Sequence, residues 1–163
     1  MNALERGKLI KPDGKAIPYI WNVRLEHKLV LLCLHGYVGS KESNVITALR
    51  ESLDAKGIGV VTFDWPAHGE SEAPDADLTV GNCLGDLKTV LAWVHERTHI
   101  PISCFATSFG GYLATLYRNE HPEVFQHLIF KIAGLEDGGD PPRASHRAGV
   151  HSSNGRGRDR PGL

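Results

Sequence analysis

One serine in this chain has the surroundings of a nucleophile. Ser108 stands in the segment ATSFGG (residues 106–111), after a short apolar run and before a helix-like stretch. A serine on a sharp turn between strand and helix has its hydroxyl pushed out toward a substrate, and the turn needs very small residues two positions before and after it. Ala106 and Gly110 meet that requirement. The backbone N–H of Phe109 would open the helix, where the helix dipole favours an oxyanion.

Two other unusual segments follow apolar runs. HGYVGS (35–40) comes after residues 29–34, and DWPAHGES (64–71) comes after residues 59–63. In a parallel sheet the carboxyl ends of the strands meet at one edge, where ligands gather. We therefore expect these segments beside Ser108. The N–H of Tyr37 is the predicted second oxyanion donor, because glycine at position 36 lets the backbone approach a ligand closely.

The elements that must position these loops can be predicted from hydrophobic periodicity. Short apolar runs bounded by turn residues indicate buried strands, and amphipathic stretches between them indicate helices. This alternation predicts an α/β fold, a three-layer α/β/α sandwich around a mainly parallel sheet of about six strands. The predicted elements are a hairpin over residues 8–23, strands at 29–34, 59–63, 102–106 and 124–132, and helices at 44–56, 78–97 and 110–119.

These three segments, in this order and spacing, resemble the α/β-hydrolase superfamily, in its branch of serine esterases, lysophospholipase-like hydrolases and cinnamoyl or feruloyl esterases. The resemblance covers roughly residues 8–133. It implies a carboxylic ester hydrolase that works through an acyl-enzyme on a small-molecule ester, with no metal or organic cofactor. Ser108 would be the nucleophile, and the backbone N–H groups of Tyr37 and Phe109 would form the oxyanion hole.

Such a hydrolase also needs a carboxylate and then a histidine later in the chain. The acid candidates are Glu136, Asp137 and Asp140, and the base candidates are His146 and His151; of these we take Asp137 and His146. All of them stand in a Gly-, Arg- and Pro-rich segment that contains few large apolar residues. Such a composition cannot bury enough surface to order itself.

We therefore expect an incomplete, C-terminally truncated hydrolase domain over residues 1–134 and a disordered or non-native tail over 135–163. This chain alone should have little or no activity. Loss of the later strands would leave residues 124–132 as an exposed sheet edge, which favours self-association.

Composition excludes several other classes. A net charge of −1 gives no indication of nucleic-acid binding, and no apolar run is long enough to span a membrane. The first residues lack a secretory signal, so we expect a cytoplasmic protein. The three cysteines, Cys33, Cys83 and Cys104, are odd in number and widely spaced, which favours buried free thiols.

Several alternatives remain at this point. Ser108 could be an ordinary helix N-cap. His95-Glu96-Arg97-Thr98-His99 matches the H-E-x-x-H pattern of a zinc peptidase, although Pro101 would end the helix close to the second histidine. A non-catalytic hydrolase-like remnant or binding module is a further possibility. We interpret His35 and His68 as structural imidazoles and Asp64 as a brace for its loop.

Overall fold

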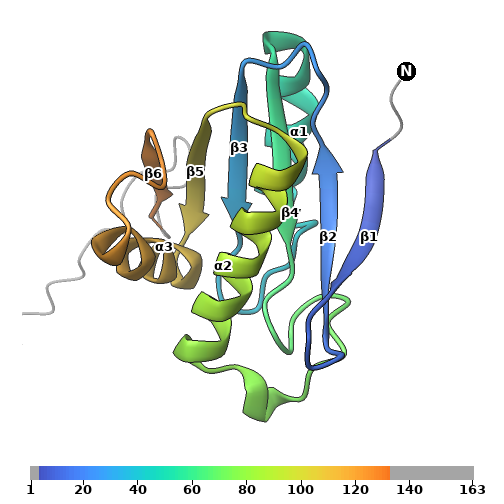
Figure 1. The fold of residues 1–163 in the computed structure, drawn as a ribbon, viewed down its shortest axis with the longest axis vertical. Helices are drawn as coiled ribbons and strands as arrows, with labels where there is room; N and C mark the ends of the chain where they lie inside the picture. Colours follow the sequence, from blue (N-terminus) through green and yellow to red (C-terminus); the bar gives the residue numbers. More distant parts are fainter. Residues whose placement is uncertain (1–3, 133–163) are drawn as a thin grey trace, which may run out of the picture.

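The computed structural model describes residues 4–132, which form one six-stranded sheet with helices on both faces (Figure 1). The strand order is β1-β2-β4-β3-β5-β6. The strands are β1 (Glu5–Ile10), β2 (Ala16–Asn22), β3 (Leu29–Leu34), β4 (Ile58–Phe63), β5 (Ile102–Thr107) and β6 (Leu128–Lys131). The helices are α1 (Asn44–Leu53), α2 (Val80–Arg97) and α3 (Phe109–Glu120), with short 3₁₀ turns at Asp54–Lys56 and Asp75–Asp77.

The centre of the sheet is parallel. β3 lies between β4 and β5 and pairs in parallel with both, and β5 pairs in parallel with β6. β1 and β2 form an antiparallel hairpin joined to β4. Nearly every residue of β3 and β4 is buried, as expected for strands covered on both faces. The carboxyl ends of β3, β4 and β5 therefore share one edge of the sheet, the lower edge in Figure 1. We call the segments that follow these three strands, residues 35–40, residues 64–71 and the Ser108 turn, the rim.

The helices complete the three layers that the sequence predicts. α2 lies in front of the sheet and α1 behind it in Figure 1. Apolar side chains from α2 and α3, among them Leu87, Val94 and Leu113, pack with the strands into the larger core, while Ile46 of α1 packs on β3 and β4. One helix, α2, begins with a side-chain cap. The Thr79 hydroxyl accepts the Asn82 N–H at 3.1 Å at the start of α2.

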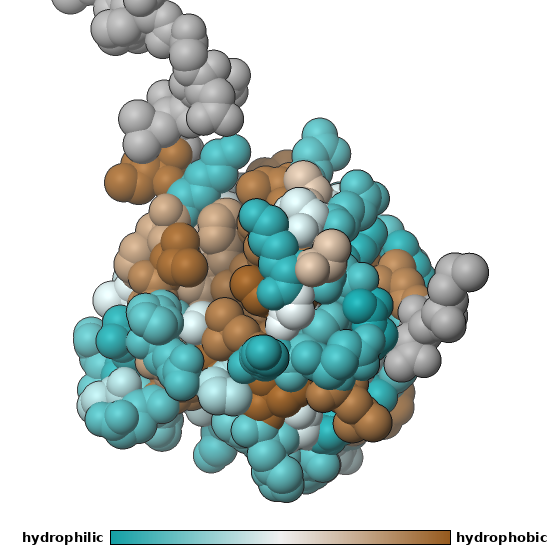
Figure 2. Space-filling view, turned by 90° about the horizontal axis from the view of Figure 1, so that it is seen from above, coloured by the Kyte–Doolittle hydropathy of each residue, from teal (hydrophilic) through white to brown (hydrophobic). Residues whose placement is uncertain are grey.

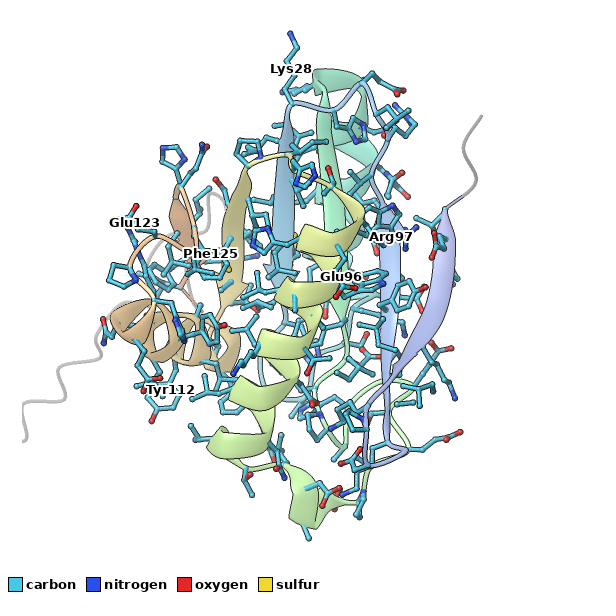
Figure 3. All side chains as sticks on the ribbon, in the orientation of Figure 1. Lys28, Glu96, Arg97, Tyr112, Glu123 and Phe125 are labelled. Atoms are coloured by element: carbon cyan, nitrogen blue, oxygen red, sulfur yellow. The ribbon has the colours of Figure 1, made fainter. Side chains whose placement is uncertain are left out.

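A cation clamp joins the N-terminal hairpin to α2. The Arg97 guanidinium lies 4.2 Å from the ring centroid of Trp21 and 4.9 Å from that of Trp93. It also donates two hydrogen bonds of 2.8 Å to Glu5, and these lower the pKa of that carboxyl. The clamp lies at the end of α2 away from the rim of loops, where Figure 3 labels Arg97. Stacking and charge together hold the edge of the sheet against the helix.

Several predicted boundaries are wrong. The hairpin begins at Glu5, not at residue 8. The last strand does not begin at residue 124, because the chain turns at residues 122–123 and an irregular segment, 124–127, buries Phe125 before β6 starts at Leu128. The long helix does not include Leu78, which belongs to the turn preceding its N-cap.

Other expectations about burial and the surface can be compared with the structure. The three cysteines are buried free thiols, as predicted. No helix within residues 4–132 is long and apolar enough to cross a membrane. The end of the molecule opposite the rim shows hydrophilic residues with hydrophobic ones between them (Figure 2).

Candidate active site

Ser108 occupies the turn between β5 and α3 in a strained conformation. Its backbone has φ 45° and ψ −115°, in the positive-φ region that non-glycine residues rarely adopt. The residue is exposed, and its side chain makes no capping hydrogen bond to α3. Ser108 stands at the N-cap position of α3, but within residues 4–132 its hydroxyl has no hydrogen-bond partner, so its side chain does not cap the helix. The turn leaves the oxygen free at the end of a parallel strand.

This turn needs small residues because the backbone of α3 comes very close to the end of β3 and to the loop that follows β3. A Cβ on Gly110 would lie 2.6 Å from the His35 carbonyl oxygen and 2.7 Å from that of Leu34. A Cβ on Gly36 would lie 3.3 Å from the Ser108 Cβ. The first turn of α3 therefore packs directly on the end of β3, and the loop after β3 lies against the nucleophile position. This contact brings the loop of Tyr37 to Ser108, as the sequence predicts for the rim.

His35 is fully buried and fixed by backbone groups on both ring nitrogens. Its Nε2 accepts the Trp65 N–H at 3.2 Å, so the proton resides on Nδ1, which donates to the Gly36 carbonyl at 2.8 Å. The indole N–H of Trp65 donates to the His35 carbonyl at 3.0 Å. Burial lowers the pKa of His35 to about 4. The imidazole is thus neutral and structural, as predicted.

His68 holds the same loop from the other side. Its Nε2 accepts the Val38 N–H at 3.1 Å, and its Nδ1 therefore donates to the Pro66 carbonyl at 2.9 Å. Val38 has φ 63°, which is strained for a β-branched residue. The Tyr37 ring meets the His68 ring edge-on, with centroids 5.6 Å apart. The hydrogen bond fixes a loop conformation that Val38 would not adopt by preference.

Asp64 braces the rim from behind. Its carboxylate accepts the backbone N–H of Lys41 at 2.8 Å, the Lys41 ammonium at 2.7 Å and the Glu70 N–H at 2.9 Å. Burial opposes the charge of Lys41, but the hydrogen bonds that its ammonium donates to Asp64 and Glu70 raise the pKa of Lys41 overall. Gly69 is required beside the carboxylate, because a Cβ there would overlap it. The brace was predicted for Asp64; Lys41 was not, since only the pairing of β3 with β4 brings the two residues together.

An open hollow of about 540 Å³ lies beside Ser108, between α3 and β6. Its lining residues are Ser108, Gly111, Tyr112, Thr115, Phe130, Lys131 and Ile132. Tyr112 projects downward from α3 (Figure 3). This hollow could not be predicted from the sequence, because it depends on how α3 lies along the edge strand.

The remaining predicted residues are not brought to this site. Asp137 and His146, with the other acid and base candidates, lie outside the described residues. The zinc alternative lacks its helical geometry: α2 ends at Arg97 and Thr98 has extended backbone, so His99 lies beyond the helix that carries His95. In the part of the chain that the structure describes, no three His, Cys, Asp or Glu side chains are grouped to hold a metal ion.

The contact between α3 and β3 can be tested with one methyl group. Gly110→Ala should lower the free energy of unfolding by about 3 kcal/mol, because neither facing carbonyl can move away without breaking the sheet. Gly85→Ala is the matched control. Its Cβ would meet nothing within 4 Å, so in the interior of α2 it should stabilise by about 0.5–1 kcal/mol. Urea unfolding measures both, and equal stability of Gly110→Ala and the parent chain would contradict the packing described.

The buried imidazole should make stability depend on pH. The pKa of His35 falls from 6.5 in the unfolded chain to about 4 in the fold, so the unfolded state binds more protons between these values. Stability from this group is complete above pH 6.5 and decreases as the pH falls toward 4, by about 3 kcal/mol in total. Urea unfolding at several pH values, with NMR of the His35 ring, measures this. A ring that protonates near pH 6.5 would refute the assignment.

Comparisons with known proteins agree with this architecture. Residues 30–145 match the family model described as alpha/beta hydrolase fold. The ferulic acid complex of Est1E from Butyrivibrio proteoclasticus is 22% identical, with a TM-score of 0.65 over 73% of this chain and 49% of that one. The thioesterase domain from the curacin biosynthetic pathway is 26% identical, with a TM-score of 0.66 over 78% of this chain and 43% of that domain.

A curated relative matches a shorter stretch. The uncharacterized 31.7 kDa protein in the traX-finO intergenic region of Escherichia coli is 27% identical over 90 residues, which is 53% of this chain and 31% of that protein. The matched part thus spans less than a third of this relative and about half of the solved structures. The family model nevertheless matches most of the chain, with β3, β5 and the Ser108 turn inside the match, and the chain belongs to the alpha/beta hydrolase fold family.

Proposed function

We propose that this chain carries the nucleophile half of a serine hydrolase that acts on carboxylic esters through an acyl-enzyme. The observation that carries the proposal is Ser108 itself. Its hydroxyl is exposed and uncapped, in a strained turn at the carboxyl end of a central parallel strand, with the Gly36 loop against it. A serine that served only to cap α3 would need neither the strain nor the close approach of the second loop.

The proposed reaction uses groups at the rim. The Ser108 oxygen attacks the ester carbonyl carbon, and the negative charge on the carbonyl oxygen is stabilised by the N–H groups of Phe109 and Tyr37. The carbon–oxygen bond to the alcohol then breaks, and the alcohol leaves with the proton taken from the serine. Water releases the acid from Ser108 by the same steps in reverse order. The mechanism calls for no metal ion or organic cofactor.

Transfer of the serine proton needs a base that the rim does not provide. Both nitrogens of His35 and of His68 are engaged with backbone groups, and the Asp64 carboxylate is paired with Lys41. Within residues 4–132 the hydroxyl has no imidazole in hydrogen-bond contact. Asp137 and His146 are the candidates left in the chain for acid and base. We therefore propose that this chain hydrolyses esters weakly or not at all, and a non-catalytic binding role is the alternative that the same observation favours.

The comparisons support the choice of reaction without extending to the substrate. Est1E was solved with ferulic acid, and the curacin relative is a thioesterase domain. Acyl transfer to a serine is the chemistry that the Ser108 turn could perform. For this chain we propose a small-molecule ester as the substrate.

Acyl transfer to Ser108 can be measured directly. We expect p-nitrophenyl acetate to acetylate Ser108 slowly, with little steady-state turnover, because the proposed mechanism has Phe109 and Tyr37 as oxyanion donors while residues 4–132 place no imidazole at the hydroxyl. Intact-protein and peptide mass spectrometry locate the acetyl group, and nitrophenolate release gives the rate. Ser108→Ala is the control and should lose the adduct. Acetylation elsewhere at an unchanged rate would reject Ser108 as the nucleophile, whereas fast turnover that Ser108→Ala abolishes would show that the chain contains its own base.

A further inference from the structure

The hollow beside Ser108 continues along α3. A second hollow, of about 460 Å³, is lined by Thr115, Arg118, Asn119, Pro122, Leu128 and Phe130. Thr115 and Phe130 line both hollows, so the two form one groove between α3 and β6, which we call the α3–β6 groove. At 1.5 Å per helical residue, the ten residues from Ser108 to Arg118 span about 15 Å. The groove is long enough for an extended chain whose reacting group lies at Ser108.

The charges that line this groove have one sign. Lys131 lies in the hollow of Ser108 and Arg118 in the second hollow, and no acidic side chain of the described residues lines either. Neither cation makes an ion pair among residues 4–132, whereas Lys8, Lys15 and Arg97 all do. The hollow between α2 and α3 differs, because it combines Lys88 with Glu120 and Glu123. In a chain of net charge −1, the α3–β6 groove is therefore a local region of positive charge.

The rest of the groove is largely apolar and open to solvent. Tyr112 is 53% exposed, Phe130 49% and Ile132 67%, and all three line the hollow next to Ser108. Apolar surface with cations at intervals complements an amphiphilic anion, since the apolar part gains from burial and the charge from the cations.

We propose that the α3–β6 groove binds esters whose apolar part carries a negatively charged group at the end away from the ester, with Arg118 as the residue that selects for that charge. This rests on the proposed function, because it places the ester at Ser108. It adds a substrate class: monoanionic amphiphilic esters over neutral esters of the same length.

The probes are the monomethyl and dimethyl esters of dodecanedioic acid, which differ only in whether the far end is charged. Binding is measured on the full chain with Ser108→Ala, by NMR shifts of the Tyr112 and Thr115 amides. We expect the monomethyl ester to bind about fivefold more tightly, as one or two exposed ion pairs would provide. Arg118→Gln should reduce this ratio, and high salt should reduce it in the parent. Lys88→Gln removes a cation outside the groove that makes no ion pair among residues 4–132; it is the matched control and should leave the ratio unchanged.

Two results would overturn the substrate class. One is equal or tighter binding of the dimethyl ester. The other is a preference for the anion that Arg118→Gln leaves intact. Because binding is measured without turnover, either result would leave acetylation of Ser108 unaffected. Conversely, a chain that is never acetylated could still show the predicted anion preference, so the two proposals fail separately.

Discussion

The rim depends on the close approach of three backbone segments: the end of β3, the turn after β5 and the first turn of α3. Gly110 lies so close to the carbonyl oxygens of Leu34 and His35 that a side chain at this position would clash with both, and Gly36 lies against Ser108. Interiors are packed too densely to absorb an extra carbon at such a contact. The strained backbone conformation of Ser108 persists because the segments packed around it, the end of β3 and the first turn of α3, leave it no room to relax. Exposure of the hydroxyl follows from this packing.

The polar residues behind the rim serve the same purpose. His35, His68 and Asp64 could each be taken for catalytic groups from their types, yet each uses its polar atoms on backbone N–H or C=O groups of neighbouring loops. These bonds satisfy buried groups that would otherwise be costly, and they fix loops with unfavourable dihedral angles such as that of Val38. The consequence is a rim with an exposed serine hydroxyl at Ser108 and, among residues 4–132, no imidazole in hydrogen-bond contact with it.

Much of the fold could be predicted because strands buried on both faces are continuous apolar runs in the sequence. The run at 29–34 is an example, and the crossover rule then places the three loops on one edge. Contacts that depend on which strands are neighbours in the sheet could not be predicted from the sequence. Lys41 meets Asp64 only because β3 and β4 are neighbours, and no residue preference places Val38 in a left-handed conformation. The α3–β6 groove was missed for the same reason, since it arises from how a helix lies along an edge strand.

A thiol at the nucleophile position tests the central claim without requiring a base, because part of it is ionised near pH 8. The native thiols should not compete. Burial raises the pKa of Cys83 to about 11 and that of Cys33 to about 12, and it also raises the pKa of Cys104.

The measurement compares the rate of acetylation by p-nitrophenyl acetate in Ser108→Cys and Thr115→Cys. The second variant places an exposed thiol in the same groove but away from the turn. If the turn presents its nucleophile to oxyanion donors, Ser108→Cys should react faster by at least about tenfold, with one acetyl group on residue 108. Equal rates, or a faster reaction at residue 115, would show that the turn provides no stabilisation of the reacting carbonyl and would contradict the account.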